Sequence, residues 1–250
     1  MTELILLGTG TVVPRLDRSS SAYLLNANGK NILIDCGAGT LRRLLEADTS
    51  YNDIDLLLLT HLHPDHTADL VPFLFACGYA SVPRTRPLKI IGGKGLKHFF
   101  TQLDNTFGRH LTSKHFDLNI REVGDESWNW EGIGFESRSV FHIPNSRGFA
   151  LEADGKKISF SGDSGYCQAL IELADKSDVF VCECALPDHE KPENHLSPSL
   201  VADIAAKANV SRLVLTHFYP EVESEPIAEI VGRKFNGEVI LGEDLMRIEV

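Results

Sequence analysis

Four side chains that can bind a metal ion lie within one stretch of six residues. The segment 61–66, with the sequence His-Leu-His-Pro-Asp-His, follows the apolar run 56–59. Burying three imidazoles and a carboxylate so close together costs free energy unless a cation or hydrogen-bond partners compensate. Neutral imidazole and carboxylate oxygens suit zinc and other borderline divalent metals. The segment therefore predicts a metal site with the ligands His61, His63, Asp65 and His66.

A catalytic metal site also needs ligands from distant parts of the chain, because one short segment rarely completes it. Three candidates each follow a predicted strand: His142, Asp163 and His217. The run 213–216 before His217 repeats the pattern of an apolar strand, a threonine and then a histidine, as in 56–61. Strand ends are where α/β proteins build active sites, so we expect these residues to join the first cluster.

The elements that must position these residues can be read from apolar periodicity and turn signals. Asn28-Gly29 and Asp154-Gly155 predict tight hairpin turns, and Ser197-Pro198 predicts a helix start. The predicted strands are 3–7, 22–25, 31–35, 55–60, 88–91, 118–123, 135–141, 149–152, 157–161, 179–184, 212–216 and 246–250. The predicted helices are 40–47, 66–75, 95–103, 168–174, 197–208 and 223–234.

The composition is that of an ordinary α/β globular protein, and we expect one domain over residues 1–250. Apolar residues make up 43% and charged residues 24% of the 250 residues, and no apolar run is long enough to cross a membrane. The start of the chain lacks a basic signal-peptide region. An odd number of cysteines, five, favours a reducing compartment. These features predict a cytoplasmic protein without a membrane partner.

The net charge of −11 argues against non-specific nucleic-acid binding, which needs a basic surface. The negative net charge does not exclude a small phosphate-bearing substrate, because a cationic site can dominate the electrostatics of its own surroundings.

The motifs resemble those of the metallo-β-lactamase superfamily, and within it the ribonuclease Z-like branch. The His-x-His-x-Asp-His motif carries the superfamily resemblance, and the block around His195 carries the resemblance to the branch. The blocks that match in order are 7–10 with Pro14, 34–39, 60–66, His142, 161–164, 194–197 and 216–218. The resemblance implies an α/β fold with a four-layer αββα sandwich.

The resemblance also implies two metal ions and the ligands of each. His61, His63 and His142 would hold the first ion, Asp65, His66 and His217 the second, and Asp163 would bridge them. A hydroxide between ions about 3.5–4 Å apart would be the nucleophile. Zinc is the expected metal, but the same ligands accept manganese or iron.

The block around His195 adds a further catalytic candidate. In the branch this histidine lies near the leaving group, where it can donate a proton. We expect Glu183 to orient it, and we count Asp65 as a catalytic residue besides its role as a ligand.

Two departures from the branch bear on the substrate. Ribonuclease Z enzymes that mature transfer RNA carry a long arm between the third metal histidine and the bridging aspartate, but here only 20 residues separate His142 from Asp163. The family's Gly-Tyr-Arg block after the third histidine reads Gly148-Phe149-Ala150, so we hypothesise that Arg147 replaces the missing arginine.

The sequence therefore predicts a metal-dependent phosphodiesterase acting on a small diester such as a cyclic nucleotide or short nucleotide product. Transfer RNA is a disfavoured partner. The alternatives are an acyl hydrolase (lactonase or thioesterase), a transfer-RNA 3′-processing endonuclease despite the missing arm, and a metal-binding protein without turnover. A homodimer is compatible with the resemblance, but the sequence leaves the oligomeric state open.

Overall fold

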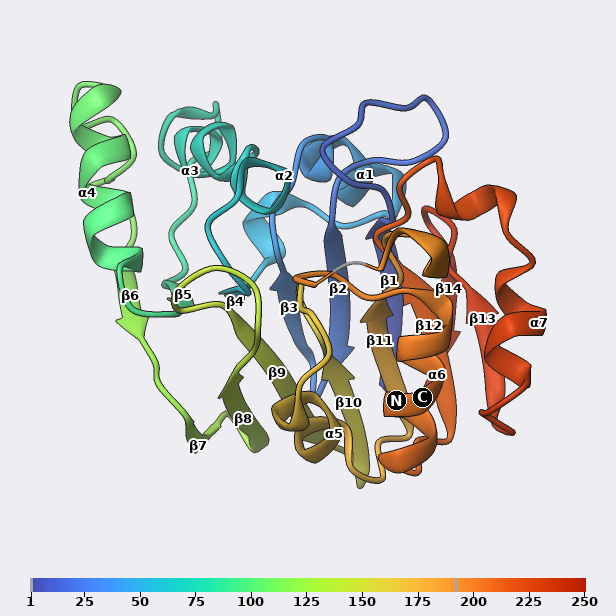
Figure 1. The fold of residues 1–250 in the computed structure, drawn as a ribbon. Helices are drawn as coiled ribbons and strands as arrows, with labels where there is room; N and C mark the ends of the chain where they lie inside the picture. The colour runs from blue at the N-terminus through green and yellow to red at the C-terminus, as the bar shows by residue number, and fades with distance from the viewer. Residues whose placement is uncertain (1, 192) are drawn as a thin grey trace.

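The computed structural model describes residues 2–191 and 193–250, which form two seven-stranded sheets (Figure 1). The first sheet has the strand order β14 (Arg247–Glu249), β1 (Glu3–Gly8), β2 (Ala22–Ala27), β3 (Lys30–Ile34), β4 (Leu56–Leu59), β5 (Leu88–Gly92) and β6 (Leu118–Glu122). The second has the order β13 (Glu238–Leu241), β12 (Arg212–Thr216), β11 (Val179–Glu183), β10 (Lys156–Phe160), β9 (Arg147–Ala153), β8 (Ile133–Ser139) and β7 (Glu126–Trp130).

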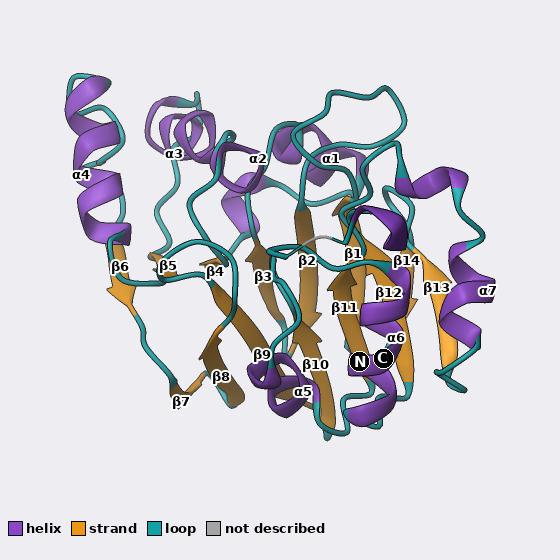
Figure 2. Ribbon diagram, viewed as in Figure 1, coloured by secondary structure: helices purple, strands orange, loops and turns teal. Residues whose placement is uncertain are grey.

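Helices cover the outer face of each sheet (Figure 2). The first sheet carries α1 (Thr40–Glu46), α2 (Pro64–Thr67), α3 (Leu70–Tyr79) and α4 (Leu96–Thr106). The second carries α5 (Gln168–Ala174), α6 (Pro198–Lys207) and α7 (Ile227–Gly232). Short 3-10 turns lie at η1 (Tyr51–Asp53), η2 (Asp188–Glu190) and η3 (Val222–Ser224). The layers run helix, sheet, sheet, helix, which confirms the predicted αββα sandwich.

Three apolar clusters hold these layers together. The first fills the space between the sheets and includes Leu58, Phe149 and Val214. The second packs the first sheet against its helices, and the third packs the second sheet against α5, α6 and α7. Side chains alternate between the two faces of each strand, so the strands that read as continuous apolar runs, such as β4, are buried on both sides.

The predicted strands and hairpins largely agree with the structure. Asn28-Gly29 and Asp154-Gly155 both turn with positive φ, as tight hairpins require. The sequence reading missed β7 and β13, since β7 alternates with exposed polar residues and β13 is a short edge strand.

The prediction of one continuous helix at 66–75 was wrong. The structure has α2 and α3 instead, separated at Ala68 and Asp69. The Asp69 N–H donates to the Cys36 carbonyl, and the Asp69 carboxylate accepts from Leu41 N, so both groups bind the α1 region. The helix predicted at 223–234 is likewise split into η3 and α7.

Parallel strands bring the candidate ligands to one edge of the molecule. β3, β4 and β5 run parallel in the first sheet, and β10, β11 and β12 run parallel in the second. Their carboxyl ends lie at the upper edge in Figure 1, where the loops connect to the helices. His61 follows β4, Asp163 follows β10 and His217 follows β12. Both sheets therefore contribute to a single edge.

The long loop between β1 and β2, dark blue at the top of Figure 1, is fastened to this edge by Asp244. The Asp244 carboxylate, with a side chain only 4% exposed, accepts from Thr9 N, Thr9 Oγ1 and Ser19 N and pairs with Arg43 at 2.9 Å. One carboxylate thus joins both ends of the loop to α1 and to the segment before β14. In the part of the chain that the structure describes, no helix is long and apolar enough to span a membrane.

We expect Asp244→Asn to lower the free energy of unfolding by about 2 kcal/mol, because it weakens an ion pair and removes an acceptor in a largely buried place. Chemical denaturation measures this. The matched control is Asp17→Asn in the same loop: that side chain is 62% exposed and pairs with Arg15, so we expect about 0.5 kcal/mol or less. Equal losses in the two variants would contradict the role given to Asp244.

Candidate metal centre

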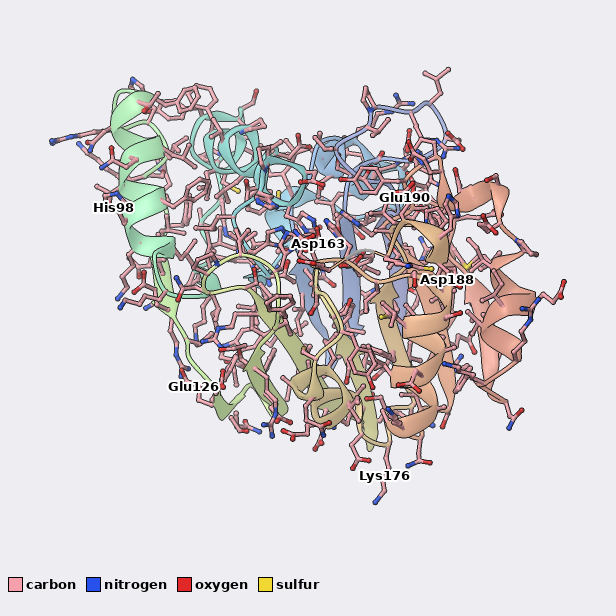
Figure 3. All side chains as sticks on the ribbon, viewed as in Figure 1. His98, Glu126, Asp163, Lys176, Asp188 and Glu190 are labelled. Carbon is pink, nitrogen blue, oxygen red and sulfur yellow. The ribbon has the colours of Figure 1, made fainter. Side chains whose placement is uncertain are left out.

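The seven predicted ligands converge beneath the upper edge. Figure 3 shows Asp163 in the interior, whereas His98, Glu126 and Lys176 lie at the periphery. Ligand atoms within 4.8 Å of one another form one group of His61, His63, His142 and Asp163 and a second group of Asp65, His66 and His217. These groups match the two ligand sets that the resemblance implied. Their role as ligands remains a prediction.

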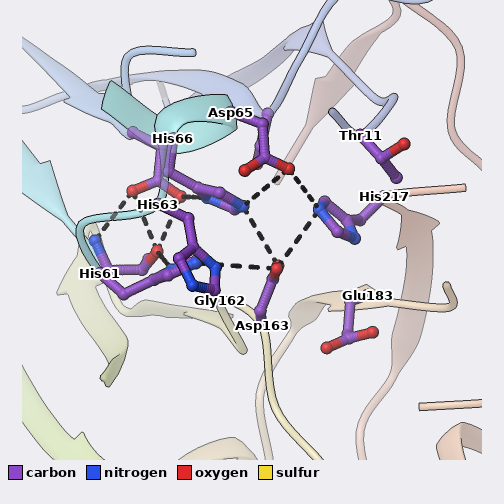
Figure 4. Close-up of polar contacts among 12 residues, drawn as sticks. Thr11, His61, His63, Asp65, His66, Gly162, Asp163, Glu183 and His217 are labelled. Atoms are coloured by element: carbon purple, nitrogen blue, oxygen red, sulfur yellow. Dashed lines mark hydrogen bonds and ion pairs between the residues drawn. The ribbon is translucent and has the colours of Figure 1, made fainter. Parts of the chain in front are cut away.

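Asp163 lies between the two groups (Figure 4). Its Oδ1 is 3.3 Å from His66 Nε2, and its Oδ2 is 3.4 Å from His217 Nε2, 3.8 Å from His61 Nε2 and 3.9 Å from His142 Nε2. One carboxylate therefore faces histidines from both groups, which is the arrangement that a bridging ligand needs.

The backbone at the strand ends takes left-handed conformations that aim these side chains. His217 has φ of 59° directly after β12, an uncommon value for a residue with a side chain. Gly162, just before Asp163, also has φ of 59°, and a Cβ there would lie 2.8 Å from Thr60 Cβ. Gly37 has no such φ but lets the backbone of Asp65 approach, since its Cβ would lie 2.1 Å from the Asp65 carbonyl oxygen.

The donor set fits divalent cations. Among the described residues, His61 Nε2, His66 Nε2 and both nitrogens of His217 are buried without a hydrogen-bond partner. Such orphan groups are rare in a stable interior unless a ligand satisfies them. Two ligand atoms on one tetrahedral zinc ion lie about 3.4 Å apart, given bonds of roughly 2.1 Å. The nitrogen–oxygen distances of 3.3–3.9 Å around Asp163 are close to that spacing.

The electrostatics put His61 and Asp163 in the protonation state that a metal requires, whereas His66 would first have to lose a proton. Burial opposes a charge on His66, but Asp163 and Asp35 hold the pKa of its imidazole well above the usual range. Burial, and next the neighbouring His66, lowers the pKa of His61 to about 2, so its imidazole is neutral. Burial opposes ionisation of Asp163, but His217 and His66 hold the pKa of its carboxyl well below the usual range. Neutral imidazole and ionised carboxylate are the protonation states that a metal requires.

Residues behind the ligands orient them, and sequence reasoning gave these residues no role. Asp35 Oδ2 lies 2.7 Å from His66 Nδ1, and the Thr60 hydroxyl donates to the Asp35 carboxylate. Thr60 Oγ1 in turn lies 3.1 Å from His61 Nδ1. With each Nδ1 bound in this way, each Nε2 faces the site. The available signal was position, since Asp35 and Thr60 both end buried strands beside the cluster.

His142 is oriented from another side. Its Nδ1 lies 2.9 Å from the Asn194 carbonyl oxygen, which leaves Nε2 toward His63 and Asp163. Asn194 directly precedes His195, so the loop that carries the predicted proton donor also contacts a predicted ligand.

His195 lies beside the ligand groups and is held by Glu183. Its Nδ1 is 3.1 Å from both Glu183 oxygens, and Glu183 also accepts from Ser164 N and Leu196 N. Although burial alone would lower it, Glu183 raises the pKa of His195 to about 9. Atoms of His195, Asp163 and His217 lie within 4.8 Å of one another. The geometry is that of an imidazolium held by a carboxylate; a catalytic role for either residue remains a prediction.

Arg147 does not fit the hypothesis that it contacts phosphate. Its guanidinium pairs with Asp125 and donates to the Ser139 hydroxyl at the end of β8. We therefore assign it no substrate contact. Tyr219, in contrast, lies at the site although sequence reasoning gave it no role: its ring centroid is 5.9 Å from that of His217 and 6.2 Å from that of His195.

Known proteins with similar sequences and folds fit this geometry. Residues 2–232 match the protein family described as anti-Pycsar protein Apyc1. The chain is 31% identical to ribonuclease Z of Mycobacterium marinum over 278 aligned positions, which cover all of this chain and 99% of that relative.

Two solved structures are also similar. One is the metallo-β-lactamase fold protein YhfI from Bacillus subtilis, with a TM-score of 0.85 and 21% identity, covering 100% of this chain and 99% of that chain. The other is the short form of human tRNase Z, with a TM-score of 0.80 and 26% identity, covering 99% of this chain and 98% of that chain.

The ribonuclease Z relative, together with the fold and the histidine–carboxylate cluster, identifies a metal-dependent hydrolase of the metallo-β-lactamase fold. Within that class, the chain belongs to the Apyc1 family and is ribonuclease Z-like, with curated relatives at about 31% identity. The family resemblance read from the motifs is thereby confirmed.

We expect Asp35→Asn to weaken metal binding by about 10- to 100-fold, because the change disturbs the hydrogen bond that orients His66. Titration of the metal-free protein with Zn²⁺ in competition with a chelator measures the affinity. Asp69→Asn, at a carboxylate that binds backbone of α1 instead, is the control and should leave the affinity unchanged. Wild-type affinity in Asp35→Asn would refute the orienting role.

Asp163→Ala should remove bound metal more completely than the loss of any single histidine, because Asp163 faces both ligand groups. Elemental analysis of the purified protein gives the metal content per chain, with His61→Ala for comparison. Two fully occupied metal positions in Asp163→Ala would show that this carboxylate bridges nothing.

Proposed function

We propose that the protein is a metal-dependent phosphodiesterase that acts on a small nucleotide diester, such as a cyclic nucleotide. The observation that supports it best is the pair His195–Glu183, which holds a proton donor beside the Asp163–His217 side of the site. Hydrolysis of an unactivated diester needs such a donor, because the leaving alkoxide is a poor leaving group.

The cofactor of this proposal is a pair of divalent metal ions, with zinc expected and manganese or iron as alternatives. His61, His63 and His142 would hold one, Asp65, His66 and His217 the other, and Asp163 both. When bound, such ions would lower the pKa of a water molecule and offset charge on the phosphoryl group.

The protein's own residues would perform the remaining steps. Asp65, whose Oδ2 is 3.4 Å from His217 Nε2, belongs to the second ligand group and would also orient the attacking water by accepting its hydrogen bond. His195 would donate a proton to the leaving oxygen from its Nε2, while Glu183 keeps Nδ1 bound and the ring oriented. No serine or cysteine nucleophile is needed in this scheme.

The secondary structure of the segment between His142 and Asp163 favours a small substrate. These residues form β9, β10 and a two-residue turn within the second sheet, so they provide no projecting arm. The alignment with the Mycobacterium marinum enzyme spans 278 positions against 250 residues here, so at least 28 positions of that relative (278 minus 250) have no counterpart.

The second candidate is ribonuclease Z activity on transfer RNA, which the names of the curated relatives favour. A panel separates the candidates: bis(p-nitrophenyl) phosphate, a 3′,5′-cyclic nucleotide, a precursor transfer RNA, a lactone and a thioester. We expect cleavage of the first two only. Cleavage of the lactone or thioester without the diesters would identify an acyl hydrolase, and specific 3′ cleavage of the precursor would support the ribonuclease.

His195→Ala should lower kcat on the cyclic nucleotide by roughly 100-fold or more, the lower end of the effect of a general acid. The loss should be smaller on bis(p-nitrophenyl) phosphate, whose leaving group needs little protonation. Metal content should stay at the wild-type value, because His195 lies outside the two main ligand groups.

The matched control is His98→Ala on the exposed face of α4, which should keep full activity. Loss of metal from His195→Ala would instead identify the residue as a ligand and overturn its role as a proton donor.

A further inference from the structure

Tyr219 stands beside the two histidines on the leaving-group side of the site. Its ring meets that of His217 edge-on, at 5.9 Å and 79°, and that of His195 at 6.2 Å and 72°. His195 and His217 are themselves stacked at 5.9 Å and 16°. Three rings from two loops therefore form one wall of the site.

The hydroxyl of Tyr219 is free to bind a ligand. Within residues 2–191 and 193–250, no hydrogen bond or ion pair involves this hydroxyl, and its side chain is only partly buried. Three of the other four tyrosines differ: the hydroxyls of Tyr23, Tyr79 and Tyr166 bind Thr216, His110 and Asp203 respectively. A phenol is protonated at neutral pH and can donate one hydrogen bond.

The position of any substrate oxygen at His195 follows from the same geometry. Atoms of Asp163, His195 and His217 lie within 4.8 Å of one another, so an oxygen that contacts His195 there lies next to the Tyr219 ring.

The backbone also fixes where Tyr219 stands. Its N–H donates to the Ala185 carbonyl, and its own carbonyl accepts from Val222 N at the start of η3. Phe218, next to it, is buried beneath the guanidinium of Arg18. The residue is thus anchored on both sides while its ring remains at the site.

We propose that Tyr219 is a substrate-contacting residue whose hydroxyl donates a hydrogen bond to the leaving-group oxygen of the diester, beside His195. This inference rests on the proposed phosphodiesterase function and adds a second donor to it. Such a contact strengthens as negative charge develops on the departing oxygen, so it affects kcat more than substrate binding.

The test compares Tyr219→Phe with the wild-type protein on two diesters. On a 3′,5′-cyclic nucleotide, whose alkoxide leaves poorly, kcat should fall about tenfold, the size expected for one neutral hydrogen bond. On bis(p-nitrophenyl) phosphate the fall should be under about threefold, because that leaving group needs little assistance. Metal content and thermal midpoint should match the wild-type values, since the ring is retained.

Tyr79→Phe is the matched control, because it removes a hydroxyl on α3 that binds His110 and should leave kcat unchanged on both substrates. Equal losses on both diesters, or none on either, in Tyr219→Phe would overturn the leaving-group contact. A wild-type protein that cleaves neither diester contradicts the proposed function instead; the same pair is then compared on a good and a poor leaving group of the ester class that is cleaved.

Discussion

A buried carboxylate within 4 Å of four imidazoles is the constraint on which the architecture depends. Asp163, whose side chain is 4% exposed, faces His61, His66, His142 and His217, and these come from both sheets. Removing so many polar groups from water costs free energy that a lone carboxylate does not recover. The apolar clusters within and around the sandwich must therefore keep the site assembled, and bound cations would satisfy the nitrogens that lack partners.

The same constraint explains why the strand ends are unusual. A strand that simply continued would carry its next side chain along the sheet, whereas the ligands must turn inward toward the other sheet. Asp35 and His217 make that turn with φ near 60°, and the hydrogen bonds around them hold the conformation. Conformations of this kind cost of order 1–3 kcal/mol and persist where the surroundings over-determine them. The same positive-φ backbone conformation therefore both carries the strain and directs the chain toward the site.

The location of the candidate residues at strand ends also explains which of them could be predicted from the sequence. The candidate ligands His61, Asp163 and His217 could be predicted because they follow buried strands whose carboxyl ends meet at one edge. Glu183 was a plausible partner of His195 on the basis of position, and the structure places the two in contact. The repeated pattern of an apolar strand, a threonine and a histidine occurs at β4–His61 and β12–His217, and both histidines lie next to Asp163 in the structure.

The features that could not be predicted from the sequence depend on contacts between residues that are far apart in the chain. Asp35 and Thr60 act through contacts between neighbouring strands. Both lie in blocks that match the family, but the sequence pattern does not show which side chains they bind. The break between α2 and α3 arises because Asp69 binds the α1 region, which a one-dimensional pattern cannot reveal. The Arg147 hypothesis failed for the same reason, since its partner Asp125 lies 22 residues earlier in the chain, before β7 and β8.

The wall of the site that holds His195, His217 and Tyr219 is built by two loops that depend on one another. Ala185, after β11, donates to the Leu196 carbonyl and accepts from Tyr219 N, while Cys184 N donates to the Thr216 carbonyl before His217. Backbone hydrogen bonds, which no side-chain substitution removes, thus connect the segments that carry His195, His217 and Tyr219. Since these bonds set the distances among the three rings, the side chains can change the chemistry of this wall without changing its shape.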